Sequence, residues 1–216
     1  NMVGDRITGL LGLLLAPAVL TAVADAEAAG GDHADIDKSV FHLFNPTPAQ
    51  YLREMDTDGP GATESPYTVD AGHFQIELTF LAYAYDTDRR GYELKAWAIA
   101  PMILKVGLLN QVDAQLVLEP YQVVEERIGS QRVTSRGFGD MTLRLKYNFW
   151  GNDAGRTAFA ATPYVKFPTS AEGLGNNSIE GGLVLPLSVD LPEDFWLGLT
   201  TRFDVMRDER KDGYHP

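Results

Sequence analysis

Long runs in which apolar and polar side chains alternate constrain this chain more than any other feature of its sequence. Between residues 140 and 149 the alternation is unbroken. Its apolar face comprises Met141, Leu143, Leu145, Tyr147 and Phe149, and its polar face comprises Asp140, Thr142, Arg144, Lys146 and Asn148. A period of two residues is typical of β-strands, because successive side chains of a strand point to opposite faces of the sheet.

The same alternation recurs from Tyr67 onward and predicts seven strands, which cover residues 73–84, 92–108, 112–119, 140–149, 158–167, 179–191 and 197–205. Most reach about ten residues, whereas soluble strands average roughly five or six. The connections alternate in length. Short gaps lie at residues 110–111, 151–155 and 192–194, and longer ones at residues 86–91, 125–139, 168–177 and 207–213.

Short turns at one end and longer loops at the other are typical of outer-membrane barrels. Closing the sheet in lipid would satisfy every backbone group, with the apolar face toward lipid and the polar face toward the lumen. We therefore expect an all-β fold, an antiparallel up-and-down transmembrane β-barrel.

Two features depart from a complete, regular barrel. Pro101, Pro120, Pro163 and Pro186 fall inside the runs, and proline cannot donate to a strand ladder, so we expect bulges or kinks there. Seven is also an odd number of strands, and no closing strand follows residue 213. We expect a C-terminally truncated fragment with about seven strands present and roughly three to five missing.

The N-terminal residues differ from the rest. Arg6 precedes an apolar run over residues 7–23, and Ala24-Asp25-Ala26 fits a cleavage site, with Ala22-Val23-Ala24 as an alternative. We expect residues 1–26 to be a cleaved signal peptide rather than a membrane anchor, and the mature protein to be exported to the bacterial outer membrane. Residues 27–66 then form a segment that stays in the periplasm or plugs the lumen, and residues 67–216 form the incomplete barrel.

Composition argues against several other functions. The net charge of −12 disfavours nucleic acid, which needs a basic face, and also argues against docking on anionic lipid headgroups. Without cysteine the chain can form no disulfide. The four histidines are scattered without metal-ligand spacing, and Ser178 and Ser188 have no histidine in the pattern to act as a base. We therefore expect no enzyme activity, no metal and no cofactor.

The polar faces of the strands carry charges of both signs. The candidate lumen-lining residues are Glu77, Lys105, Glu119, Tyr121, Arg144, Lys146, Glu180 and Arg202. They would serve solvation and cross-strand pairing, or else form a selectivity ring in which Arg144 and Lys146 face Glu119 from an adjacent strand. Four aromatic residues share the expected lumen parity and would fill the barrel or guide aromatic solutes: Tyr83, Tyr85, Trp97 and Tyr121.

Several motifs resemble those of the MetA-pathway of phenol degradation family, often labelled "transporter". They are Thr57-Asp58-Gly59-Pro60, Thr63-Glu64-Ser65-Pro66-Tyr67-Thr68-Val69, Gly72-His73-Phe74-Gln75, Leu104-Lys105-Val106-Gly107-Leu108, Leu118-Glu119-Pro120-Tyr121, Gly139-Asp140-Met141-Thr142-Leu143-Arg144-Leu145-Lys146 and Glu180-Gly181-Gly182. Gly59 stands where the family is expected to carry arginine. The resemblance covers residues 44–214 and implies an outer-membrane barrel that passes small solutes, aromatic or apolar ones included.

These observations favour a porin-like conduit whose partners are outer-membrane lipid and a small solute. Two alternatives remain open at this point. One is a non-conducting structural or binding barrel in the same membrane, and the other is a soluble exported β-sandwich that binds a ligand.

Overall fold

The computed structural model describes residues 36–59, 63–88, 91–175, 177–193, 195–208 and 213–215, and it is an all-β, antiparallel structure. The predicted signal peptide and its cleavage sites lie outside the described residues. The helical elements among the described residues are two 3₁₀ turns, η2 (Lys38–Val40) and η3 (Ala49–Tyr51). The strands are β1 (Phe74–Leu78), β2 (Leu81–Thr87), β3 (Tyr92–Ile99), β4 (Met102–Leu109), β5 (Val112–Leu118), β6 (Tyr121–Ile128), β7 (Gln131–Gly137), β8 (Met141–Trp150), β9 (Thr157–Phe167), β10 (Glu180–Asp190), β11 (Trp196–Asp208) and β12 (Gly213–His215).

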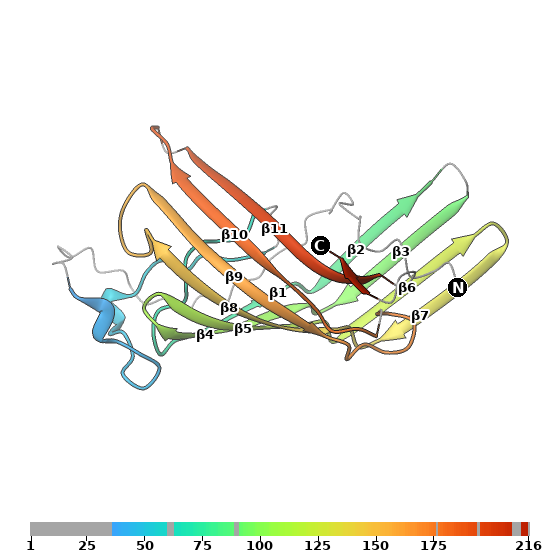
Figure 1. The fold of residues 1–216 in the computed structure, drawn as a ribbon, viewed down its shortest axis with the longest axis horizontal. Coiled ribbons are helices and arrows are strands. Elements are labelled where there is room, and N and C mark those ends of the chain that lie inside the picture. Colours follow the sequence, from blue (N-terminus) through green and yellow to red (C-terminus); the bar gives the residue numbers. More distant parts are fainter. Residues whose placement is uncertain are drawn as a thin grey trace.

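Two sheets contain these strands. The larger sheet has the order β1-β4-β5-β8-β9-β10-β11-β12, and the smaller has the order β2-β3-β6-β7. The smaller sheet projects from one end of the larger, whereas η2 and η3 lie at the opposite end (Figure 1). Over the described residues both sheets are open, because no pairing joins β1 to β12 in the larger sheet or β2 to β7 in the smaller. No helix in the described part of the chain is long and apolar enough to cross a membrane.

The chain runs through the sheets as a meander of long, broken strands. β1 continues into β2, β3 into β4, β5 into β6 and β7 into β8, with only two or three residues between the halves. Each break lies where the chain passes from one sheet to the other. Counted along the meander, β1–β2, β3–β4, β5–β6, β7–β8, β9, β10 and β11 correspond to the seven predicted strands.

The prediction of a long loop over residues 125–139 was wrong. These residues continue the third strand as β6 and begin the fourth as β7, joined by a tight turn in which Gly129 has φ +59°. A positive φ at a turn glycine is typical of two-residue hairpins. The hairpin escaped detection because its sequence, YQVVEERI followed by QRVTSRG, has polar residues on both faces.

The breaks also shift the side-chain alternation by one residue. The side-chain amide of Gln122 donates a hydrogen bond to the Glu119 carboxylate. Residues three apart in an uninterrupted strand point to opposite faces, so the break at Pro120 brings Gln122 onto the face of Glu119. Gln122 pairs with Ala98 on β3, and Gln115 pairs with Lys105 on β4. The shift therefore recurs between β3 and β4, where Ala100 has φ +55°.

Proline behaves as expected of a residue that interrupts ladders. Pro101 and Pro120 occupy two of the breaks. Pro163 lies where the pairing of β8 with β9 is interrupted, between Arg144–Tyr164 and Tyr147–Ala161. The β9–β10 pairing is likewise interrupted at Pro186.

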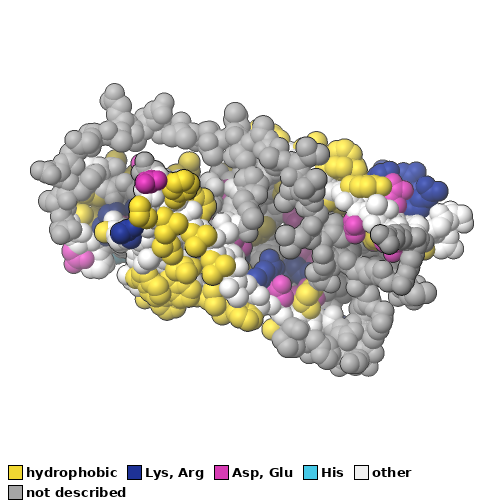
Figure 2. Space-filling view, turned by 90° about the horizontal axis from the view of Figure 1, so that it is seen from above, with side chains coloured by type: hydrophobic (Ala, Val, Ile, Leu, Met, Phe, Trp, Pro, Cys, Tyr) yellow, Lys and Arg dark blue, Asp and Glu magenta, His cyan; other side chains and the backbone are white. Residues whose placement is uncertain are grey.

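Burial in the larger sheet is inverted relative to a water-soluble protein. Lys146 and Asp113 are wholly buried, whereas Phe74 is 77% exposed and Ile76 is 68% exposed. The exposed apolar side chains form broad patches on the surface (Figure 2). Contiguous apolar surface of this kind marks contact with a membrane or a partner, because soluble monomers rarely expose it.

Candidate functional site

The buried polar face of the larger sheet is covered by an N-terminal segment that we call the strap, residues 53–59 and 63–70. The strap meets the sheet at β4, where Ala71 forms a bridge with Gly107 and the Gly72 amide donates to the Gly107 carbonyl at 2.9 Å. A side chain at residue 107 would collide with the Asp70 carbonyl, so only glycine permits this approach.

Asp58 of the strap is the centre of the site. Its carboxylate oxygens lie 2.6 Å from Lys105 Nζ and 2.7 Å from Lys146 Nζ. Glu77 on β1 forms a second ion pair with Lys105 and accepts hydrogen bonds from the Asp58 amide at 3.0 Å and the Gly59 amide at 3.2 Å. Two lysines and two carboxylates thus connect β1, β4, β8 and the strap.

The rest of the strap is held mainly through its backbone. Lys146 Nζ donates to the carbonyls of Ser65 at 2.7 Å and Tyr67 at 3.2 Å. Asn148 donates to the Pro66 carbonyl at 2.9 Å. The Val69 amide donates to the Asp113 carboxylate at 3.0 Å. Buried backbone groups need such partners, and here the polar face of the sheet supplies them.

Further charged contacts fix the middle and the start of the strap. Near its middle, Glu64 pairs with Arg144, and the Glu64 amide donates to the Thr200 hydroxyl at 2.9 Å. At its start, Arg53 Nη1 donates to Asn110 at 2.8 Å and to Asp153 at 2.9 Å, and the Arg53 amide donates to Asp70 at 2.8 Å.

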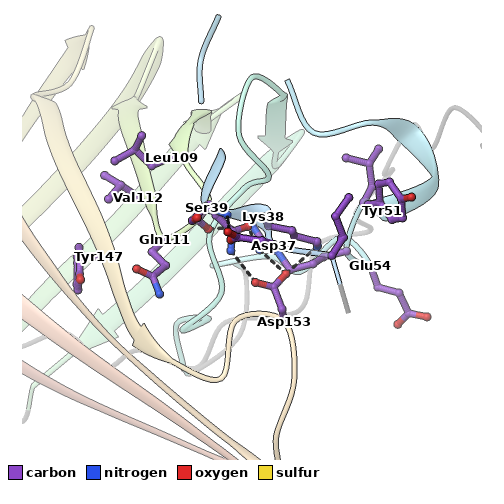
Figure 3. Close-up of a pocket in the computed structure, with 14 residues that line it drawn as sticks. Asp37, Lys38, Ser39, Tyr51, Glu54, Leu109, Gln111, Val112, Tyr147 and Asp153 are labelled. Atoms are coloured by element: carbon purple, nitrogen blue, oxygen red, sulfur yellow. Dashed lines mark hydrogen bonds and ion pairs between the residues drawn. The ribbon is translucent and has the colours of Figure 1, made fainter. Parts of the chain in front are cut away.

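Arg53 and Asp153 border a cavity of about 850 Å³ at this end of the sheet. In Figure 3 Lys38 and Asp153 point toward each other, and their charged atoms lie 2.7 Å apart. Burial favours the neutral acid at Asp153, but hydrogen bonds from Lys38 and Asn110 and the charge of Arg53 outweigh it and lower its pKa. The β4–β5 turn, the β8–β9 turn and the strap are therefore tied together by charged groups.

The electrostatics of Asp58 favour its ionised form. Burial opposes ionisation and is the largest single effect. The charges of Lys146 and Lys105 and their hydrogen bonds together exceed it, and hold the pKa of the carboxyl well below its usual range. Asp58 is therefore a fixed anion between two cations at neutral pH.

The structure brings four of the eight predicted lumen residues together. Glu77, Lys105, Arg144 and Lys146 all lie under the strap and bind it. The expected opposition of Arg144 and Lys146 to Glu119 is not found. Arg144 pairs across the ladder with Gln115 and Lys146 with Asp113, because the strand register places them there. The ion partners of both cations come from the strap instead.

The other four residues lie apart. Glu180 forms an ion pair with Lys166 at 2.5 Å. Arg202 contacts Asp204 at 2.7 Å and the Tyr164 hydroxyl at 2.8 Å. Glu119 binds Gln122, as described above. Tyr121 was assigned to the wrong face, because the break at Pro120 reverses the parity.

The same correction applies to the other aromatic residues expected on the lumen side. Tyr83 pairs with Trp97, and Tyr121 pairs with Ile99. These two pairs lie on the face of the sheet opposite to that of Gln122 and Ala98. Tyr85 and its partner Lys95 lie on the same face as the two pairs. The four aromatics therefore continue the apolar face of the larger sheet onto the smaller one.

Sequence reasoning missed Asp58 as a member of the site. It lies outside every alternating run, and only its place in the motif Thr57-Asp58-Gly59-Pro60 drew attention to it. Asp113, Gln115 and Asn148 could have been found, because they occupy the polar parity of their strands. No cluster of three metal-ligating side chains occurs within the described residues. The arrangement can hold a chain segment in place and present charges of both signs.

Comparison with known proteins gives one result. The model of a family described as "Putative MetA-pathway of phenol degradation" matches residues 57–216, which include most of the strap and every strand. No curated protein and no solved structure matches the chain.

Proposed function

Since the chain belongs to the family described as "Putative MetA-pathway of phenol degradation", we propose that it is an outer-membrane β-barrel that passes small solutes by diffusion, aromatic or apolar ones included. Residues 1–26 would direct its export. The proposal gives the chain no catalytic role.

The observation that carries this proposal is the inverted burial of the larger sheet. Lys146, Asp113 and Asn148 are wholly buried, whereas Leu197, Leu199 and Phe203 are more than half exposed. In water such an arrangement exposes the side chains that gain most from burial. In a bilayer the apolar face meets lipid, and the polar face lines an interior where its charges are paired or hydrated.

Strand geometry supports the same environment. β8, β9 and β10 have 10, 11 and 11 residues. Tilted strands of about 9–11 residues span the hydrocarbon core of a membrane. The meander joins neighbouring strands by short turns at residues 110–111 and 151–156. These turns lie together at one end of the sheet, where Arg53 at the start of the strap contacts Asn110 and Asp153.

The proposal is tested by gel mobility of the mature full-length protein refolded in detergent, cold against boiled. We expect the unheated protein to migrate faster, as a closed barrel that resists detergent. A protein that shows no shift and stays soluble without detergent would refute the membrane assignment. It would instead indicate a periplasmic β-sandwich.

A non-conducting barrel is the second candidate, and the strap favours it because it occupies the polar face. Planar-bilayer recordings separate the two. A conduit gives single-channel currents, and deleting residues 32–64 is expected to raise them. A barrel that inserts without current in both forms would be structural or binding in function.

A further inference from the structure

The outward face of the two hairpins β2–β3 and β6–β7 carries successive rows of apolar, aromatic and charged side chains. It lies on the side of the sheet away from the proposed solute pathway. Cross-strand partners share a face, so the registers arrange its side chains in rows. The row nearest the breaks is apolar and consists of Leu81, Ile99 and Tyr121. The next row contains Tyr83, Trp97, Val123 and Arg136, and the two rings lie 4.2 Å apart.

Toward the hairpin tips the rows become charged. Tyr85, Lys95, Glu125 and Thr134 form the third row, and Thr87, Glu93, Arg127 and Arg132 form the fourth. Arg127 and Arg132 expose 61% and 63% of their side chains. At this end of the molecule basic side chains gather beside hydrophobic ones (Figure 2).

The cations of these hairpins are sorted onto one face. Over the described strands, the outward face carries Lys95, Arg127, Arg132 and Arg136 against Glu93 and Glu125. The opposite face carries Asp86 and Glu126 and no lysine or arginine. A chain with a net charge of −12 thus has a net positive surface next to its apolar face, toward the hairpin tips.

Internal ion pairing leaves cationic groups available. Glu93 is shared between Lys95 at 2.8 Å and Arg127 at 3.8 Å, and Glu125 pairs with Arg132. Four cations therefore have two carboxylate partners on this face. Exposed pairs of this kind are worth little, so an anionic ligand can compete for the arginines.

We propose that this face docks phosphorylated lipid headgroups of the membrane in which the protein sits. The inference rests on the proposed function, because it needs the apolar face to contact lipid. The order of the rows, first apolar, then aromatic, then charged with Lys95, Arg127 and Arg132, matches acyl chains, the interfacial region and headgroup phosphates. Arginine binds phosphate oxygens in a bidentate manner. These residues should therefore prefer a phosphorylated headgroup to an uncharged sugar.

The test uses the full-length protein in phosphatidylcholine nanodiscs with and without diphosphoryl lipid A. The melting temperature of the protein is measured as lipid A is added, and the lipid A concentration that gives half of the maximal increase is the apparent affinity. In the double variant R127Q/R132Q we expect the apparent affinity to fall about 25-fold, since each basic residue near a membrane surface contributes roughly a fivefold effect. The matched control is R156Q, because Arg156 is an exposed arginine at the opposite end that donates to the Asp190 carbonyl.

Unchanged lipid A affinity in R127Q/R132Q, or an equal loss in R156Q, would overturn the inference. Stabilisation by inorganic phosphate alone in phosphatidylcholine nanodiscs would also overturn it, because the ligand would then be free phosphate. A wild-type protein that enters nanodiscs but ignores lipid A refutes this inference alone. A wild-type protein that enters no bilayer refutes the proposed function and this inference with it.

Discussion

Replacing Asp58 with asparagine should release the strap from the polar face. The variant keeps the size of the side chain but removes the charge that Lys105 and Lys146 share. Removing one partner of a buried ion pair costs about 3–5 kcal/mol. Lys105 keeps its ion pair with Glu77, and Lys146 keeps its hydrogen bonds to the carbonyls of Ser65 and Tyr67. We therefore expect a cost at the lower end of that range.

A loss of about 3 kcal/mol corresponds to roughly a hundredfold increase in the population of the released strap. Trypsin can report this population, because Arg53 begins the strap and its side chain is only 11% exposed. Cleavage after Arg53 follows the equilibrium population of the open form when opening is fast relative to cleavage. We expect cleavage of the Asp58→Asn variant to be about a hundredfold faster and its bilayer current to be larger.

Asp56→Asn is the matched control. Asp56 lies two residues away and accepts a hydrogen bond from the Ser65 hydroxyl at 2.7 Å, but no ion pair joins it to a described cation. The heat-dependent gel shift expected of the proposed barrel shows whether both variants still fold. If both are folded and trypsin cleaves them at the wild-type rate, the buried ion pair does not hold the strap and the reasoning fails.

Two further predictions concern the attachment of the strap to the sheet. The pKa of Asp58 is lowered in the folded protein, so its stabilising effect is present above the usual aspartate pKa of about 3.9 and is lost as the pH falls through the lower folded value. Cleavage at Arg53 by an acid-tolerant protease of matching specificity should stay constant from neutral pH to about 5 and rise below about 4, and Asp58→Asn should flatten this rise. Gly107→Ala should place a methyl group on the Asp70 carbonyl, lowering stability by about 1–3 kcal/mol and speeding tryptic cleavage, whereas Gly59→Ala meets open space and should leave both unchanged.

Alternation was sufficient to locate β1, β4, β5, β8, β9, β10 and β11 of the larger sheet. The pattern over residues 140–149 is regular because one face of β8 is uniformly apolar. The hairpin β6–β7 could not be found in this way, since its outward face mixes apolar, aromatic and charged residues. Where a strand extends beyond apolar surroundings, polar residues cost little on either face. The alternation of apolar and polar residues is then lost.

The candidate site was predicted in part for a similar reason. Lys105, Arg144 and Lys146 stand out because a charge between apolar neighbours must face away from them. Their partners do not stand out. Asp58 and Glu64 belong to a segment without periodicity, and its position on the sheet depends on contacts between residues as far apart as Asp58 and Lys146. Contacts of that separation leave no local trace in one sequence.

Parity along a strand can be extrapolated only as far as the next break. Tyr121 follows Glu119 by two residues, and simple alternation places both on one face. Pro120 inserts one residue into the count, so Gln122 takes the inward position and Tyr121 moves outward. Because the paired strands share the shift, the whole smaller sheet is reversed relative to the naive assignment. The aromatic residues thereby leave the inward face and join the basic residues at the outward surface. Net charge misleads in the same way, because a chain of −12 can still carry a positive face where its cations are sorted to one side.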